Sequence, residues 1–163
     1  MVTAVDFGFR VTDFKSVKPG DIFIEYAGGE GLLVAMRIKA PDNQPWMLTF
    51  HPHKPTVSKS KRHEDRDVGV IDSRIVSPAI NSKNLLQRKE GLGAGSMLFG
   101  TGETLLRADF NGTEVWEVNL ASGDARISKP FAGPFWTDRW SIHAVRSSGS
   151  DEIFRFDGSA LSP

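Results

Sequence analysis

Three of the four histidines, His51, His53 and His63, fall close together in the chain, and Glu64 follows them directly. In an extended segment, residues i and i+2 point to the same side about 6–7 Å apart, so His51 and His53 can converge on one ion. The chain has no cysteine, so a metal site must use imidazole or carboxylate groups, which suit first-row divalent cations. The candidate ligands of a divalent transition metal are therefore His51, His53, His63, His143 and Glu64.

The same histidines also fit a solvated loop. Between residues 52 and 67 the only apolar side chain apart from proline is Val57, so this stretch is expected to be a long, polar, exposed loop. Acidic neighbours dilute its lysines and arginines, and it holds no aromatic residue for stacking on bases. The whole chain carries 20 basic and 20 acidic side chains and no formal net charge, so nucleic-acid binding is not expected.

The segment His51-Pro52-His53, on a predicted β scaffold, resembles the histidine pair of cupin barrels. Those barrels often supply a glutamate four or five positions after the second histidine, where this chain has Val57 and Ser58. The resemblance covers three residues, and the chain is not assigned to the family. It implies a metal-dependent enzyme with one coordination position open to water or substrate. The ligands that it implies are His51, His53, His143 and either His63 or Glu64.

A second group of candidate residues is aromatic. Phe135, Trp136 and Trp140 lie in a segment that Pro130 and Pro134 stiffen. Aromatic side chains held by rigid turns can form a ligand wall or an interface anchor. They can equally cover one open end of a β core. Phe135, Trp136 and Trp140 are therefore the candidate ligand-binding residues, with a structural role as the alternative.

No complete catalytic set is visible in the sequence. The glycine-rich residues 91–95 are not followed by a P-loop lysine, and the predicted order of helix and then strand is the reverse of a dinucleotide-binding loop. Ser96 lacks the glycine two positions later that a nucleophile elbow requires. These patterns favour a non-catalytic role.

The scaffold that must position these groups is predicted to be made of strands. Residues 5–12 alternate between apolar and polar side chains, as a half-buried strand does. Pro19-Gly20 fits a type II turn, and Asn111-Gly112 fits the type I′ turn of a two-residue hairpin loop. That hairpin joins residues 104–110 to residues 113–120.

The whole chain, residues 1–163, is predicted to be a single, mainly β domain. About ten strands without a β-helix-β rhythm indicate an antiparallel sandwich or barrel. One short helix is expected near residues 82–90, because Asn81 or Ser82 can cap it and Gly91 can end it. Residues 158–163 are expected to form a loose tail.

The sequence shows no signal peptide, and no segment reaches the roughly 20 apolar residues of a membrane helix. A soluble, cytoplasmic protein without membrane contact is therefore expected. Zero net charge lowers colloidal repulsion, which is compatible with a homo-oligomer. The predicted function is a non-catalytic β module that self-associates or binds a partner or a small ligand. The alternative is a metal-dependent, cupin-like enzyme that uses the loop histidines.

Overall fold

The structure is a computed structural model. It describes residues 8–26, 28–42, 44–51, 53–60, 64–79, 92–100, 102–130 and 135–158. The helix expected near residues 82–90, His63, and the expected tail apart from Gly158 lie outside these residues. None of the helices in the described part is long and apolar enough to cross a membrane.

The described residues form a mainly β structure, as predicted, with two short 3₁₀ helices, η1 (Phe14–Ser16) and η2 (Gly28–Glu30). The strands outnumber the ten or so that were expected. They are β1 (Phe9–Asp13), β2 (Ile22–Tyr26), β3 (Leu32–Lys39), β4 (Pro45–Thr49), β5 (Thr56–Lys59), β6 (Asp67–Ile71), β7 (Arg74–Pro78), β8 (Met97–Gly100), β9 (Glu103–Phe110), β10 (Glu114–Asn119), β11 (Ala125–Ile127), β12 (Phe135–Thr137), β13 (Arg139–Arg146) and β14 (Gly149–Asp157).

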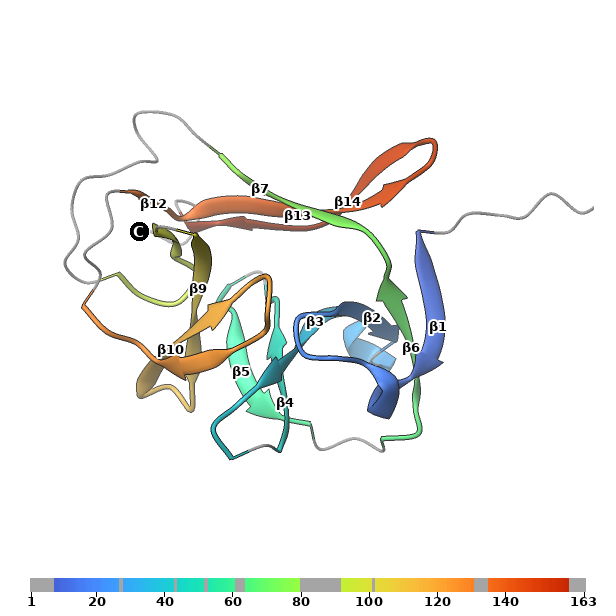
Figure 1. The fold of residues 1–163 in the computed structure, drawn as a ribbon, viewed down its shortest axis with the longest axis horizontal. Helices are drawn as coiled ribbons and strands as arrows, with labels where there is room; N and C mark the ends of the chain where they lie inside the picture. Colours follow the sequence, from blue (N-terminus) through green and yellow to red (C-terminus); the bar gives the residue numbers. More distant parts are fainter. Residues whose placement is uncertain are drawn as a thin grey trace, which may run out of the picture.

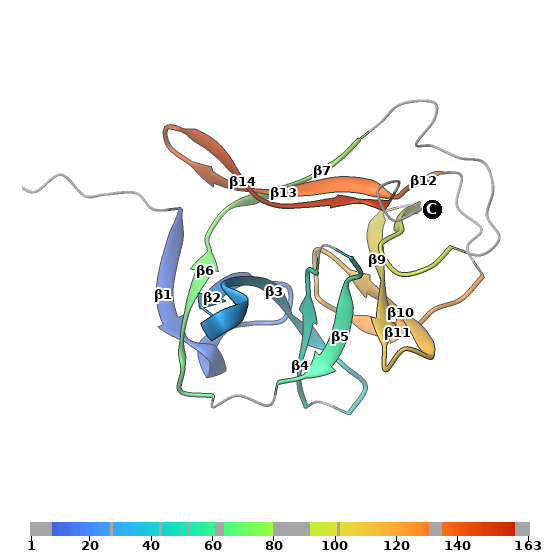
Figure 2. The ribbon, with the colours of Figure 1, turned by 180° about the vertical axis from the view of Figure 1, so that it is seen from behind.

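The strands form two sheets. In the larger sheet the order is β1-β6-β2-β3-β4-β5-β9-β10-β11, and β8 pairs with both β9 and β12. In the smaller sheet the order is β14-β13-β7. The neighbours are antiparallel except for β5 and β9, which pair in parallel at Thr56↔Asp109. Figures 1 and 2 show the smaller sheet lying across the strongly curved larger sheet, as in a sandwich.

The main core fills the space between the two sheets. Apolar side chains from β2, β3, β4, β9 and β10 meet Trp140, Ile142 and Phe156 of the smaller sheet. Because alternate residues of a strand face opposite sides, the larger sheet also has an outer face. There η1 and the residues after it place Phe14 and Val17 over a second apolar cluster on β2, β3 and β6.

The chain between residues 52 and 67 differs from the prediction of one continuous loop. That prediction is wrong over β5, which pairs with β4 from Thr49↔Thr56 to Trp46↔Lys59. Val57 is its only apolar residue and is 1% exposed, opposite Leu48 on β4. The strand joins β4 to β9 within the sheet, so backbone pairing holds it and one buried side chain suffices.

The hairpin predicted around Asn111-Gly112 is confirmed. Strands β9 and β10 pair from Phe110↔Glu114 inward, and Asn111 and Gly112 have φ of 54° and 72°, as a type I′ turn requires. The pairing leaves Thr113 in the loop as a third residue, so the loop is one residue longer than predicted. Strand β11 then pairs with β10, as the third strand of a meander.

Two glycine turns meet where the larger sheet curves back on itself. Gly20 and Gly123 have φ of 92° and 76°, and a Cβ on Gly123 would overlap the backbone nitrogen of Gly20. The Gly20 N–H donates to Arg37 O at 2.8 Å, and the Lys39 N–H donates to Gly123 O at 2.9 Å. The chain before β2 and the chain after β10 are therefore in direct backbone contact at the end of β3.

Arg74, at the start of β7, pins this junction to the smaller sheet. Its Nη2 donates to Gly20 O at 2.6 Å and to Leu120 O at 3.0 Å. Burial lowers the pKa of Arg74, and the charge of Asp21 acts in the opposite direction. An arginine side chain stays protonated in a protein in spite of such a shift. One guanidinium cation therefore binds the carbonyl groups of Gly20, before β2, and Leu120, after β10.

Replacing Gly123→Ala should destabilise the protein more than Gly112→Ala, although both residues have positive φ. A Cβ added at Gly112 would have no atom within 4 Å. Gly112→Ala should therefore lower the free energy of unfolding only by the strain of a left-handed alanine, about 1–2 kcal/mol. Gly123→Ala adds backbone overlap, for a further cost of about 1–3 kcal/mol. Urea unfolding of both variants measures the difference, and equal losses would contradict a tight junction.

Replacing Arg74→Met should cost about 2 kcal/mol of unfolding free energy, because two part-buried carbonyl groups lose their charged donor. Arg74→Lys, which keeps one donor group, should lose less. Arg155→Met is the control, since Arg155 is exposed and its side chain donates to nearby Glu152, and it should change the denaturation midpoint little. A similar small effect for Arg74→Met would show that the clamp is unimportant.

Candidate functional site

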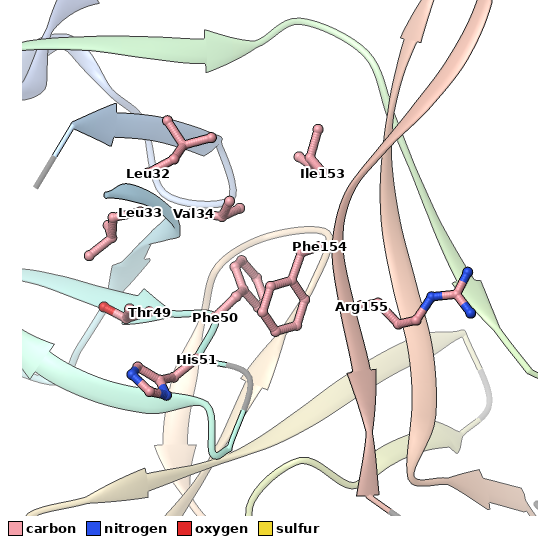
Figure 3. Close-up of a pocket in the computed structure, with 9 residues that line it drawn as sticks. All are labelled: Leu32, Leu33, Val34, Thr49, Phe50, His51, Ile153, Phe154 and Arg155. Atoms are coloured by element: carbon pink, nitrogen blue, oxygen red, sulfur yellow. The ribbon is translucent and has the colours of Figure 1, made fainter. Parts of the chain in front are cut away.

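A cleft of about 690 Å³ opens between the two sheets. Three segments line it: residues 32–34 of β3, residues 49–51 at the end of β4, and residues 153–155 of β14 (Figure 3). Sites for small molecules typically enclose about 300–1,000 Å³ and have mainly apolar walls. This cleft therefore has the size of a small-molecule site.

A β-bulge builds one wall of the cleft. Strands β13 and β14 pair at Ile142↔Phe154 and then at His143↔Glu152, so Ile153 is an extra residue in β14. Bulges re-aim side chains and are common beside binding sites. In Figure 3, Ile153 and Phe154 both lie on the cleft side of β14, whereas Arg155 points to the opposite side. The extra residue thus gives the wall two consecutive apolar side chains.

The facing wall comes from β3 and the end of β4. Leu32 and Val34 alternate with Leu33, which points away from β14, and Phe50 points toward Phe154 (Figure 3). The Phe50 N–H donates to Val34 O at 3.0 Å, which carries the β3–β4 pairing to the edge of the cleft. The same alternation turns the side chains of Thr49 and His51 to the other face of the sheet. The side chains of this wall that face β14 are therefore apolar, while Thr49 and His51 line the cleft from segments whose side chains turn to the other face.

The floor of the cleft is a cluster of aromatic rings. The ring centroids of Phe50 and Phe154 lie 5.7 Å apart. The ring centroid of Trp140 lies 6.0 Å from that of Phe50 and 5.4 Å from that of Phe154. Trp140 also stacks on Phe156 at 5.4 Å, and its Nε1–H donates to Gly95 O at 2.8 Å. Because the indole is fixed by stacking and by a hydrogen bond, the floor is rigid.

The apolar surface continues beyond the cleft at its rim. Leu32 is 64% exposed and pairs across the strands with Tyr26, which is 77% exposed. The next pair on the same face is Ile24↔Val34, and Val34 is buried in the main core. The inner face of the β2–β3 hairpin thus runs from the core, past the cleft, into solvent.

The structure brings two of the predicted metal ligands together. The rings of His51 and His53 are exposed and their centroids lie 5.7 Å apart. Glu64 lies beside η1, where its carbonyl oxygen accepts from the Lys15 N–H at 3.0 Å. His143 lies on β13, with its Nε2 2.9 Å from Ser141 Oγ.

Within the described ranges, no three histidine, aspartate or glutamate side chains gather closely enough to hold a metal ion. Glu64 and His143 therefore do not join the pair of His51 and His53. His63 lies outside the described residues, so its part in a metal site stays a prediction.

The predicted aromatic candidates have separate positions. Trp140 is buried behind Phe50 and Phe154 and does not itself line the cleft. Trp136 is buried in another cluster, with Leu92, Leu98 and Leu105. Phe135 is 53% exposed on β12.

The residues of the cleft wall itself were not found from the sequence. Alternation in the strand-like segment 152–156 does place Phe154 and Phe156 on one face. No local pattern marks Ile153 as the extra residue, because its bulge is defined by pairing with β13. Leu32 belongs to a predicted strand. It is exposed because the smaller sheet, which covers the core, does not cover it, and the sequence around Leu32 does not indicate where that cover ends.

Comparison with known proteins gives no relative from which a function could be transferred. No protein-family model matches the sequence, and no curated protein or solved structure matches it significantly. The residues that face the cleft are therefore the basis for a functional interpretation.

Deleting Ile153 should remove the bulge without changing the pairing on either side of it. Phe154 would still face Ile142, and Glu152 would still face His143, in a regular antiparallel ladder. The variant should fold and lose about 1 kcal/mol, for the half-buried side chain that is removed. Cross-strand NMR contacts between β13 and β14 measure the register, and a register shifted along the whole hairpin would contradict this account of the wall.

Proposed function

We propose that the protein is a non-catalytic β module that binds a small apolar ligand in the cleft between its two sheets. The observation that carries this proposal is the bulge at Ile153, which turns Ile153 and Phe154 together toward the cleft. Phe154 supplies an aromatic surface, and Leu32 and Ile153 supply aliphatic ones, beside Val34 and Phe50, which are largely buried in the core. Removing such surfaces from water contributes about 25 cal/mol per Å² of apolar area.

The chemistry of the lining residues supports binding rather than catalysis. The side chains of Leu32, Val34, Phe50, Ile153 and Phe154 carry no nucleophile, acid or base. The hydroxyl, imidazole and guanidinium groups of the lining segments belong to residues that alternate to other faces. Catalysis requires such groups within hydrogen-bond reach of a bound substrate.

A metal-dependent activity remains the alternative prediction. The side-by-side rings of His51 and His53 favour it, but they are two ligands, and a catalytic zinc site typically has three protein ligands and one open position. Self-association through the exposed rim at Tyr26 and Leu32 would be another use of the same surface. The ligand-binding experiment below separates these uses.

An uncharged apolar fluorophore, phenylnaphthylamine, should bind the protein saturably at one site. Leu32→Glu should weaken this binding about tenfold or more, because it places a carboxylate at the rim of an apolar cleft. Leu32 is 64% exposed, so the substitution should leave the unfolding midpoint nearly unchanged. Fluorescence titration measures the affinity.

The matched control is Ile127→Glu. Ile127 is an aliphatic strand residue of similar exposure, 61%, and lies on β11, outside the cleft lining. It should bind the fluorophore like the unmodified protein. Equal weakening in both variants, or no saturable binding, would contradict the proposal. Sedimentation of the free protein at rising concentration shows whether a second copy occupies the rim instead.

A further inference from the structure

We infer that the ligand of the cleft is an uncharged, largely hydrocarbon molecule, and that the cleft selects against both anions and cations. This inference rests on the proposed function, because it specifies the ligand of the same site. Its basis is the electrostatics of the residues around the cleft.

None of the side chains that Figure 3 shows facing the cleft carries a charge. The charged residue in the lining segments is Arg155, and its guanidinium points away from Phe154 (Figure 3). Its Nε and Nη2 donate to the two carboxylate oxygens of Glu152 at 3.0 and 2.6 Å. These hydrogen bonds lower the pKa of Glu152 and raise the pKa of Arg155. The two charges therefore satisfy each other.

A charged ligand group would lose water in the cleft and find no counter-ion among the described side chains that face it. A polar group transferred to an apolar site without a partner is destabilised, and a charged group much more so. An uncharged body is not penalised in this way, and it can contact the aliphatic side chains of Leu32 on one wall and Ile153 on the other. Selection by charge follows from the walls alone.

The rim indicates how such a ligand is oriented. The apolar face leads outward from Val34, past Leu32, to Tyr26, whose phenol group is the first uncharged polar group along the hairpin. A ligand with its hydrocarbon body against Phe50 and Phe154 would keep one hydroxyl or carbonyl group toward this exposed end. The structure thus favours a molecule of the class of long-chain or aromatic alcohols and ketones.

Two matched series of compounds test this inference by displacement of phenylnaphthylamine near pH 7. One series has a flat body (naphthylmethanol, naphthoate and naphthylmethylammonium), and the other has a linear body (decanol, decanoate and decylammonium). In each series the alcohol should bind at least about tenfold more tightly than either ion, since only the ions lose solvation without a partner. The series that binds better shows whether the body is flat or linear.

Two charge variants at the rim locate the head group. Leu32→Lys should improve the binding of the carboxylates, and Leu32→Glu that of the ammonium compounds, each several-fold relative to the opposite variant. Ile127→Lys and Ile127→Glu should not change the order. If an ion binds as tightly as the alcohol while Leu32→Glu still weakens phenylnaphthylamine, the ligand class is wrong and the site stands. If Leu32→Glu does not affect phenylnaphthylamine, the proposed function fails.

Discussion

The contact between the turns at Gly20 and Gly123 determines how far the larger sheet curves. These turns lie at strands that are far apart in the sheet, with β3, β4, β5 and β9 between β2 and β10. Their backbones can touch only because neither residue has a Cβ and both adopt positive φ. Lys39 also forms a parallel bridge to Asp124 beside this contact. The sheet is therefore drawn almost into a ring at the end of β3 where Lys39 lies.

The interior shows the consequence of this curvature. At the drawn-in end, Trp46 of β4 stacks on Trp116 of β10 with ring centroids 5.6 Å apart, and Phe110 contacts both. At the other end of the same strands, Leu32 and Phe50 face β14 of the smaller sheet. One end of the interior is filled by aromatic rings from the larger sheet itself. The other end depends on the smaller sheet for its cover, and the cleft lies there.

Sequence patterns predicted the parts of this structure that depend on neighbouring residues. Asn111-Gly112 specified its hairpin because both residues tolerate positive φ, and alternation specified strands such as β4. Strand β5 was missed because its pairing with β4 and β9 needs only one buried side chain, Val57. The candidate site was mostly missed for a similar reason. The wall at Ile153 is defined by a register shift against β13, which no local pattern reports.

The prediction of a metal site also shows that local patterns do not report contacts between distant strands. Spacing alone placed His51 and His53 near each other, because residues i and i+2 of an extended chain are neighbours whatever the fold. For His143 to join His51 and His53 at a metal ion, the face of β13 that carries His143 would have to turn toward the end of β4. The pairing of β13 with β14 and β7 instead turns Ile142 into the core and His143 away from it. A site assembled from distant strands requires the right residue types and also requires each residue to lie on the face of its strand that turns toward the site.

The positions of the junction and the cleft explain how the protein can be both stable and open. Strand β3 carries Arg37 and Lys39 at its closed end and Leu32 and Val34 at the cleft, so closure and opening use different residues of one strand. A bulge disrupts a ladder locally, and the disruption at Ile153 leaves Arg74, which holds Gly20, paired with Ala144 on β13. The closed end can therefore hold the curvature while the other end keeps an apolar surface that the two sheets do not cover. Because the rim residue Leu32 is exposed, changes there should act on binding almost independently of folding.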